Sequence, residues 1–359
     1  MKAEDKRIIK KSLTKLLKKL DKINKQHYYE NTVHNGKKMR EVIKNNPVLF
    51  EETGLERPAR SFLPSLFIAA ALPLRNIKKN VFERKYNNVN LKITGAEKVP
   101  FGKNARLLLS LLTTHSVLNG ESGDTVKISY KAVSDLCSEL QLPRQRSSDV
   151  IMQLEYFSTS SFVYQGRTVV KDIQKSLFSE YSDEMQDMYV SEIRTGQVPF
   201  IDNLRYLKGE SINRIEYKGI EFEINAKFAE IARKHAVPIN YDIYKDISSA
   251  LGKDLYAWLC YRNNSFSAES SRPLLIGKDA LINQFLPVNE ELDVESSRAM
   301  RSKNYQLIVE RLKEIKSDYY KDLNIQFLAD NSGIVLYRSP SPIGADDRKR
   351  FVLVTDILP

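Results

Sequence analysis

The sequence has few of the residues that form disulfides and metal sites. Its 359 residues include two cysteines and four histidines. Cys137 and Cys260 each fall in an apolar helical pattern, which predicts buried small side chains in a reducing compartment. No Cys/His cluster has zinc spacing. We therefore expect no disulfide, no metal and no cofactor.

Long apolar runs are also missing. No stretch approaches the roughly 20 consecutive apolar residues that a membrane span needs. The first 20 residues carry charges throughout and lack a small-residue cleavage site, so they do not resemble a secretory signal. We expect a cytoplasmic protein of about two domains with no membrane partner.

Nucleotide binding is not supported by the glycines. A P-loop needs four residues between its glycines and a Ser or Thr after the lysine. Gly95 and Gly102 have six residues between them, and Asn104 follows Lys103. Two further Gly-Lys pairs, at 252–253 and 277–278, lack an upstream glycine. All three pairs are typical of helix starts.

DNA nicking by a tyrosine ordinarily requires a His-rich metal site, and the histidines are scattered with no His-x-His pair. We therefore interpret Tyr28-Tyr29 and Tyr319-Tyr320 as packing residues. The acidic residues form no short Asp-x-Asp clusters. The sequence predicts a protein that is not an enzyme, with a rolling-circle nickase as a less favoured alternative.

Positive charge is concentrated at the N-terminus. The formal charge of the chain is +11, and residues 1–46 hold 14 basic against 5 acidic residues. A polyanion partner, chiefly nucleic acid, is indicated. Apolar residues at spacings of 3 and 4 predict a basic amphipathic helix over 4–25, within an N-terminal segment of residues 1–50. This helix could dock on its own protein, oligomerise or contact DNA.

The body of the chain predicts a series of elements that occurs twice. In the first copy we expect a helix at 103–118, a strand at 125–129, helices at 130–140 and 149–158, and a hairpin turning at Gly166. Ser147 or Ser148 is expected to cap the third helix. An earlier hairpin is expected to turn at Asn87-Asn88, and a polar, acidic insert covers 174–213. Two more strands around Lys218-Gly219 and a helix follow.

The second copy runs from a helix at 248–263 through a strand at 272–276 to helices at 277–287 and 296–320. A hairpin around residues 331–333 closes it. Helix, strand, helix, helix and hairpin is the order of a winged helix. The predicted fold class is α+β, with two tandem winged-helix domains at 60–236 and 240–345 and a C-terminal tail at 346–359.

A winged helix places its third helix in the major groove, while helix N-termini and the wing contact phosphates. Arg suits guanine, and Asn or Gln suits adenine. The predicted DNA-binding residues of the second copy are Arg298, Arg301, Lys303, Asn304 and Gln306. Those of the first copy are Arg144, Arg146, Ser147, Ser148, Gln153 and Lys103. The acidic run at 288–295 is expected to face away from phosphate or to meet a protein partner.

A series of short motifs, in order, resembles the RepA-type plasmid replication initiators. They span residues 60–343 and are Leu72-Pro73, Phe82-Glu83-Arg84, Pro100-Phe101-Gly102, Arg106-Leu107-Leu108-Leu109, Leu112-Thr113-Thr114, Leu255-Tyr256-Ala257-Trp258-Leu259, Tyr261-Arg262, Gly333 and Ser339-Pro340-Ser341-Pro342-Ile343. The chain departs from the family at 142–149, where a glycine-rich turn is usual, and at 115–117, where an acidic residue and alanine are usual.

The resemblance implies two winged-helix domains that bind repeated origin sites (iterons) in double-stranded DNA, help to open the duplex and recruit a host helicase or initiator. It also implies that monomers initiate and that homodimers repress the initiator's own gene, which controls plasmid copy number. A winged-helix transcription regulator that binds only an operator is the alternative.

Overall fold

The computed structural model describes residues 59–86, 89–119, 125–169, 190–194, 196–211, 214–264, 266, 273–288, 293–343 and 348–349. The chain divides after Arg57. The basic helix predicted at 4–25, Tyr28-Tyr29 and most of the predicted tail lie outside the described residues. The described part is a mixture of helix and sheet, as the sequence predicts.

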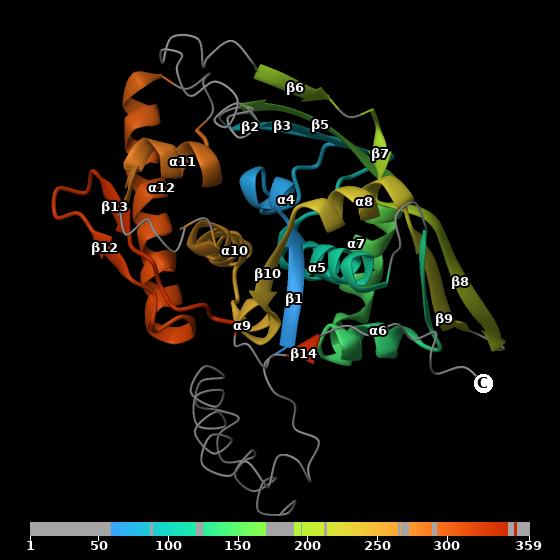
Figure 1. Ribbon diagram of the computed structural model, residues 1–359. Helices are drawn as coiled ribbons and strands as arrows, with labels where there is room; N and C mark the ends of the chain where they lie inside the picture. Colours follow the sequence, from blue (N-terminus) through green and yellow to red (C-terminus); the bar gives the residue numbers. More distant parts are fainter. Residues whose placement is uncertain are drawn as a thin grey trace, which may run out of the picture. The chain divides into compact units, whose positions relative to one another are not determined.

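The first half contains a helix–strand–helix–helix–hairpin series, in which three strands of another sheet, within residues 160–199, lie between the last helix and the hairpin (Figure 1). Its members are α5 (Gly102–Asn119), β4 (Val126–Tyr130), α6 (Val133–Glu139), the 3-10 turn η1 (Arg144–Arg146), α7 (Ser147–Ser158), β8 (Ile201–Ser211) and β9 (Arg214–Ile224). The three strands form an antiparallel sheet in the order β4-β9-β8. The first strand therefore pairs with the last strand of the hairpin.

The second half repeats this series. Its members are α10 (Ala250–Asn264), β11 (Leu274–Gly277), α11 (Lys278–Phe285), α12 (Val294–Glu314), β12 (Ile325–Phe327) and β13 (Gly333–Leu336), with a π-helical turn η3 (Ile315–Tyr319) ending α12. The sheet order is β11-β13-β12, so the first strand again pairs with the last. A Cβ on Gly333 would lie 2.2 Å from the carbonyl oxygen of Ile276, so this close pairing requires glycine.

Further strands surround the first series. They are β2 (Val81–Tyr86), β3 (Val89–Gly95), β5 (Ser160–Val169), β6 (Val190–Arg194) and β7 (Val198–Pro199) in one sheet, and β1 (Ala59–Pro64), β10 (Ala236–Asn240) and β14 (Arg348–Lys349) in another. Strand β1 pairs with β10 and with β14, so it joins the start, middle and end of the described chain. The short helices α4 (Ser65–Ala69), α8 (Ala226–Lys234) and α9 (Tyr241–Asp246) complete the fold.

Two turn predictions and the predicted insert differ from the structure. Strand β5 runs straight through Gly166, because the ladder with β3 pairs Gly166 with Val89 and continues to β6. Strand β9 likewise runs through Lys218-Gly219, where a shift in the pairing with β8 places a β-bulge in the strand. The predicted insert at 174–213 contains β6, β7 and β8, so part of it belongs to the sheets. The predicted turn Asn87-Asn88 lies outside the described residues.

One hydrophobic core runs through both halves. Helices α5 and α10 lie side by side in it, and α10 also contacts α12 (Figure 1). Every residue from Ala105 to Ser116 and from Leu251 to Cys260 is buried. Because both helices are buried on all sides, the two halves are not separate globules in the described part of the chain.

Candidate nucleic-acid interface

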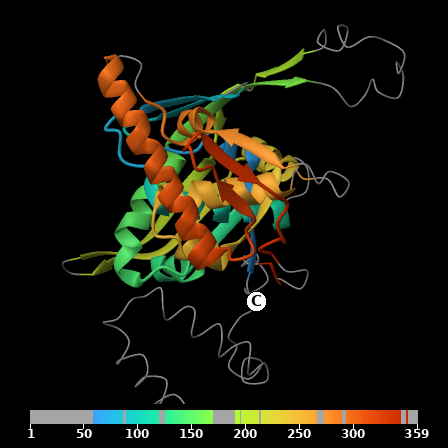
Figure 2. The ribbon, with the colours of Figure 1, turned by 90° about the vertical axis from the view of Figure 1, so that its left-hand side faces the viewer.

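Helix α12 presents one long face outward. It buries Tyr305, Ile308 and Leu312 against its neighbours, and Figure 2 shows it along its length beside the β12–β13 hairpin. These buried residues recur every three or four positions, so the opposite face of the helix is exposed. Ile308, Leu312 and Ile315, spaced by four and three residues, form a buried stripe toward the core.

Three of the predicted DNA-binding residues on α12 are exposed: Arg298, Lys303 and Gln306. No hydrogen bond or ion pair joins them to other described residues. Their side chains can therefore reach a ligand without first breaking a contact within the described part of the chain.

Two other predicted residues of α12 are already engaged. Asn304 donates from Nδ2 to the carbonyl oxygen of Leu286 at 2.8 Å, which fastens α12 to the end of α11. Arg301 forms an ion pair with Asp279, with 2.7 Å between Nη2 and Oδ1, and a long hydrogen bond to Asn283. Both residues hold α12 against α11 in this structure.

We expect the Asp279→Asn substitution to strengthen binding to all DNA about two- to fivefold. Asp279 is largely exposed, so the pair contributes little stability, and its removal frees a guanidinium and deletes a negative charge beside α12. Titration of unrelated duplexes at several salt concentrations measures this. Asp202→Asn, on β8, is the control that removes one exposed charge elsewhere, and equal gains from both variants would contradict a role for Arg301.

The exposed face of α12 also carries apolar side chains that the prediction missed. Met300 and Leu307 are 43% and 36% exposed and lie on the same side of the helix as Lys303. Apolar side chains contact the thymine methyl group in the major groove. Their spacing of seven residues on the polar side of the helix was a signal in the sequence, which a search for polar residues alone passes over.

The N-terminus of α12 is acidic. Asp293 caps the helix by accepting a hydrogen bond from the backbone N–H of Ser296, and this bond lowers the pKa of the Asp293 carboxyl. Glu295 is exposed in the first turn. Residues 289–292 of the predicted acidic run lie outside the described residues. Negative charge at the first turn favours contact with DNA through the middle of the helix.

The N-terminus of α7 carries the predicted residues of the first half. Arg144, Arg146 and Ser148 are exposed. Arg146 pairs with Asp149 at 3.0 Å, and both side chains are about half exposed, so the pair offers little resistance to a phosphate. The predicted capping role of Ser147 is wrong, because its hydroxyl donates back to the carbonyl oxygen of Arg144 and the cap position is Arg146. Lys103 is exposed at the start of α5.

Gln153 does not face DNA, and its predicted contact with a base edge is wrong. Its side chain is 2% exposed and its Oε1 accepts the backbone N–H of Phe101 at 2.9 Å. The prediction failed because the side of α7 that carries Gln153 faces the segment before α5. Gln153 is a structural residue that joins these two elements.

We expect Gln153→Leu to lower the free energy of unfolding by about 1–3 kcal/mol, because the N–H of Phe101 loses its buried partner. The preference for one DNA sequence over another is expected to stay unchanged. Urea denaturation and competition binding measure the two quantities. A change of sequence preference without a loss of stability would restore Gln153 to the interface.

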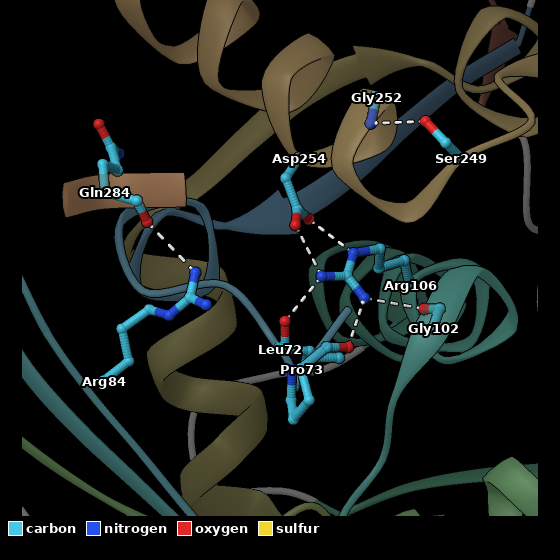
Figure 3. Close-up of polar contacts among 9 residues, drawn as sticks. All are labelled: Leu72, Pro73, Arg84, Gly102, Arg106, Ser249, Gly252, Asp254 and Gln284. Carbon is cyan, nitrogen blue, oxygen red and sulfur yellow. Dashed lines mark hydrogen bonds and ion pairs between the residues drawn. The ribbon is translucent and has the colours of Figure 1, made fainter. Parts of the chain in front are cut away.

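A buried ion pair joins the two halves, as Figure 3 shows. Arg106 on α5 donates from Nε and Nη2 to the two carboxylate oxygens of Asp254 on α10, each at 2.6 Å. The remaining N–H groups donate to the carbonyl oxygens of Leu72, Pro73 and Gly102. Several residues that carry the family resemblance therefore meet at one point. From the sequence, Arg106 was noted only as part of the motif Arg106-Leu107-Leu108-Leu109, and no ion pair was predicted for it.

Next to this pair lies a second buried cation. The Nζ of Lys253 donates to the carbonyl oxygens of Tyr244 and Lys245 at the end of α9. Burial lowers the pKa of Lys253 from 10.5 to about 7. The group lies inside the protein, so it stabilises the end of α9 and is not available to DNA.

Stability is expected to rise with pH through Lys253. Between pH 7 and 10.5 the folded protein binds fewer protons at this group than the unfolded chain, which favours folding by about 1.4 kcal/mol per pH unit. The Lys253→Met variant lacks this slope. We expect the free-energy difference between wild type and variant to shift by about 2 kcal/mol from pH 7.5 to pH 9, measured by urea denaturation. A constant difference over this range would contradict the lowered pKa.

Other chemistry is limited in the described part of the chain. Cys137 and Cys260 are free and buried, as predicted, and burial raises the pKa of Cys260 to about 12. Among the described residues no three His, Cys, Asp or Glu side chains cluster so that they could hold a metal ion. The described helices include none with the length and apolar character for crossing a membrane.

No family model and no curated protein matches this chain. Two similar solved structures hold domains 2 and 3 of RctB, at 12% and 9% identity and TM-scores of 0.45 and 0.41. They cover 77% and 75% of this chain, and 99% and 94% of the RctB chains.

A third similar structure is the Pi initiator protein in complex with iteron DNA, at 13% identity and a TM-score of 0.37. It covers 77% of this chain and 94% of that chain. An initiator is thus among the similar structures.

Proposed function

We propose that this chain is a plasmid replication initiator that binds repeated origin sequences in double-stranded DNA. Each half forms a winged helix, with α7 and α12 as the helices that approach the major groove. Origin opening and recruitment of a host helicase or initiator follow binding, and a homodimer serves repression. The chain performs no covalent chemistry on DNA.

The observation that carries the proposal is the repeated series of elements with the same strand order. In each copy the last helix of the series has exposed basic residues at or near its start, namely Arg144 and Arg146 in the turn before α7 and Arg298 and Lys303 on α12. In a winged helix this is the helix that enters the groove. Two such helices in one compact unit fit a long, bipartite site.

Within the proposed interface, α12 reads bases through Lys303 and Gln306, while Met300 and Leu307 contact thymine methyl groups. Arg298, Arg301, Arg144, Arg146, Ser147, Ser148 and Lys103 hold the phosphate backbone. Residues 1–50 supply further positive charge. The order of motifs from Leu72 to Ile343 favours an initiator over a regulator that binds an operator alone.

A nickase is the weakest alternative because the described tyrosine pair is engaged in packing. Tyr320 is buried, donates its hydroxyl to the carbonyl oxygen of Pro340, and has a pKa raised by burial. The hydroxyl of Tyr319 donates to the carbonyl oxygen of Asp246 at 3.2 Å. Neither hydroxyl is placed to attack a phosphate.

The test uses tiled duplexes from the DNA that flanks the gene, footprinted near physiological salt with excess unrelated competitor. We expect protection bounded by direct repeats, with permanganate-reactive melting of an adjacent A·T-rich segment. Protection of one palindrome without melting would favour a transcription regulator. Strand cleavage with covalent attachment to a tyrosine would establish a nickase. Weak binding everywhere, with steep salt dependence, would contradict sequence-specific recognition.

A further inference from the structure

The contact between the two halves uses equivalent helices. Helices α5 and α10 are the first helix of each series, and each has a Gly-Lys pair in its first turn. Arg106 lies four residues after Gly102, and Asp254 lies two residues after Gly252. Each half therefore contributes one partner to the ion pair, and the pair lies where the two repeats meet.

The geometry of this contact is directional. All five N–H groups of Arg106 are used, two of them on Asp254 and the other three on main-chain carbonyls of the first half (Figure 3). Apolar packing is non-directional, whereas a bidentate Arg–carboxylate pair fixes both distance and angle. A bidentate pair at this contact therefore favours one relative orientation of the two halves.

A second buried arginine extends the contact toward α12. Arg84 on β2 donates from Nη1 to the carbonyl oxygen of Gln284 on α11 at 3.2 Å. Burial lowers the pKa of Arg84 to about 10, while Asp254 opposes this shift. Helix α11 in turn holds α12 through Asn304 and Arg301. Polar contacts thus run from β2 through α11 to α12, while the pair of Arg106 and Asp254 joins α5 to α10.

We propose that Arg106, Asp254 and Arg84 are positioning residues that fix the register between α7 and α12, so that the protein selects DNA by the spacing of two contacted segments. This inference rests on the proposed function. One inserted base pair moves one segment by about 3.4 Å and about 35° relative to the other. A rigid protein loses one of its two contacts at that spacing, whereas a loosened protein keeps both.

The first test requires no DNA. Spin labels are attached to cysteines introduced by Glu155→Cys on α7 and Glu310→Cys on α12, both exposed positions. The native cysteines are buried and remain unlabelled. We expect a narrow distance distribution in the otherwise wild-type protein and a clearly broader one with Arg106→Met and Asp254→Leu together.

The control for these variants is the exposed pair Lys234 and Glu230 within α8, replaced by Met and Leu. This change deletes the same charges without touching the contact between the halves, so the distribution should stay narrow. If the double variant at 106 and 254 does not fold, Arg106→Lys keeps the charge but loses the bidentate fork. Equally narrow distributions in the folded variants and the wild type would overturn the inference.

The second test measures binding to duplexes in which one base pair is inserted between the two footprinted segments. We expect the affinity of the wild-type protein to fall about tenfold or more. The affinity of the variant with Arg106→Met and Asp254→Leu is expected to fall less than about threefold. Identical spacing profiles would overturn the inference while leaving DNA binding intact. Absence of specific binding by the wild type would overturn the proposed function, and the spin-label result would still report on the contact.

Discussion

Arg106→Met is expected to lower the free energy of unfolding by about 3–5 kcal/mol, because it leaves the buried carboxylate of Asp254 without its partner. Asp254→Leu alone is expected to lower the free energy of unfolding by a similar amount, because it leaves the buried guanidinium of Arg106 without its carboxylate partner. The double variant is expected to recover part of the loss, because a hydrophobic pair replaces two compensating buried charges, whereas the carbonyl groups of Leu72, Pro73 and Gly102 stay without their donor. Urea denaturation of the four proteins, analysed as a double-mutant cycle, gives the coupling between the residues.

The control is the exposed pair on α8, for which the same cycle should give a much smaller coupling, because solvent screens exposed ion pairs. A double variant at 106 and 254 that is as unstable as the sum of the single variants would show that shape complementarity dominates. In that case electrostatic compensation would not explain the stability of the contact.

Lys303→Ala is expected to weaken binding to the specific site by about 1–3 kcal/mol, that is about five- to 150-fold. Lys303 is exposed at the middle of the outward face of α12 and has no partner among the described residues. Removing a base contact lowers the preference for the specific site over unrelated DNA. Competition titrations at fixed salt measure both affinities.

Lys313→Ala is the matched control on the same helix. The ammonium of Lys313 lies over the ring of Phe327, farther along α12 than Lys303. The substitution therefore removes the same charge from a different position on the helix. We expect a small, uniform loss for all DNA and a slightly flatter salt dependence. Equal losses of specificity from both variants would show that net charge, and no particular groove contact, sets the affinity.

The series of elements could be predicted from the sequence because its strands and helices follow local patterns of apolar residues. Alternating burial in β4 and the apolar stripe of α12 follow directly from residue spacing. The turns could not be predicted as well. Gly166 and Lys218-Gly219 are turn-like in the sequence, but the neighbouring strands impose a straight ladder at one and a bulge at the other. Tertiary pairing therefore overrode local preference.

The site could be predicted only in part, for the same reason. Residue type suggests what Arg301, Asn304 and Gln153 could bind, but their partners on other elements decide what they do bind. The ion pair of Arg106 with Asp254 joins positions 148 residues apart, so no local pattern could reveal it. Charge in a buried helix was the only sequence signal.

The burial of α5 and α10 on all sides limits how such proteins can diversify. A chimaera that joins the first half of one relative to the second half of another would bring together two helices adapted to different neighbours. New DNA specificities should therefore arise by substitution on the outward faces of α7 and α12, and exchange of whole halves should fail. The two halves share a topology, but they are built around one continuous hydrophobic core and so cannot be exchanged separately.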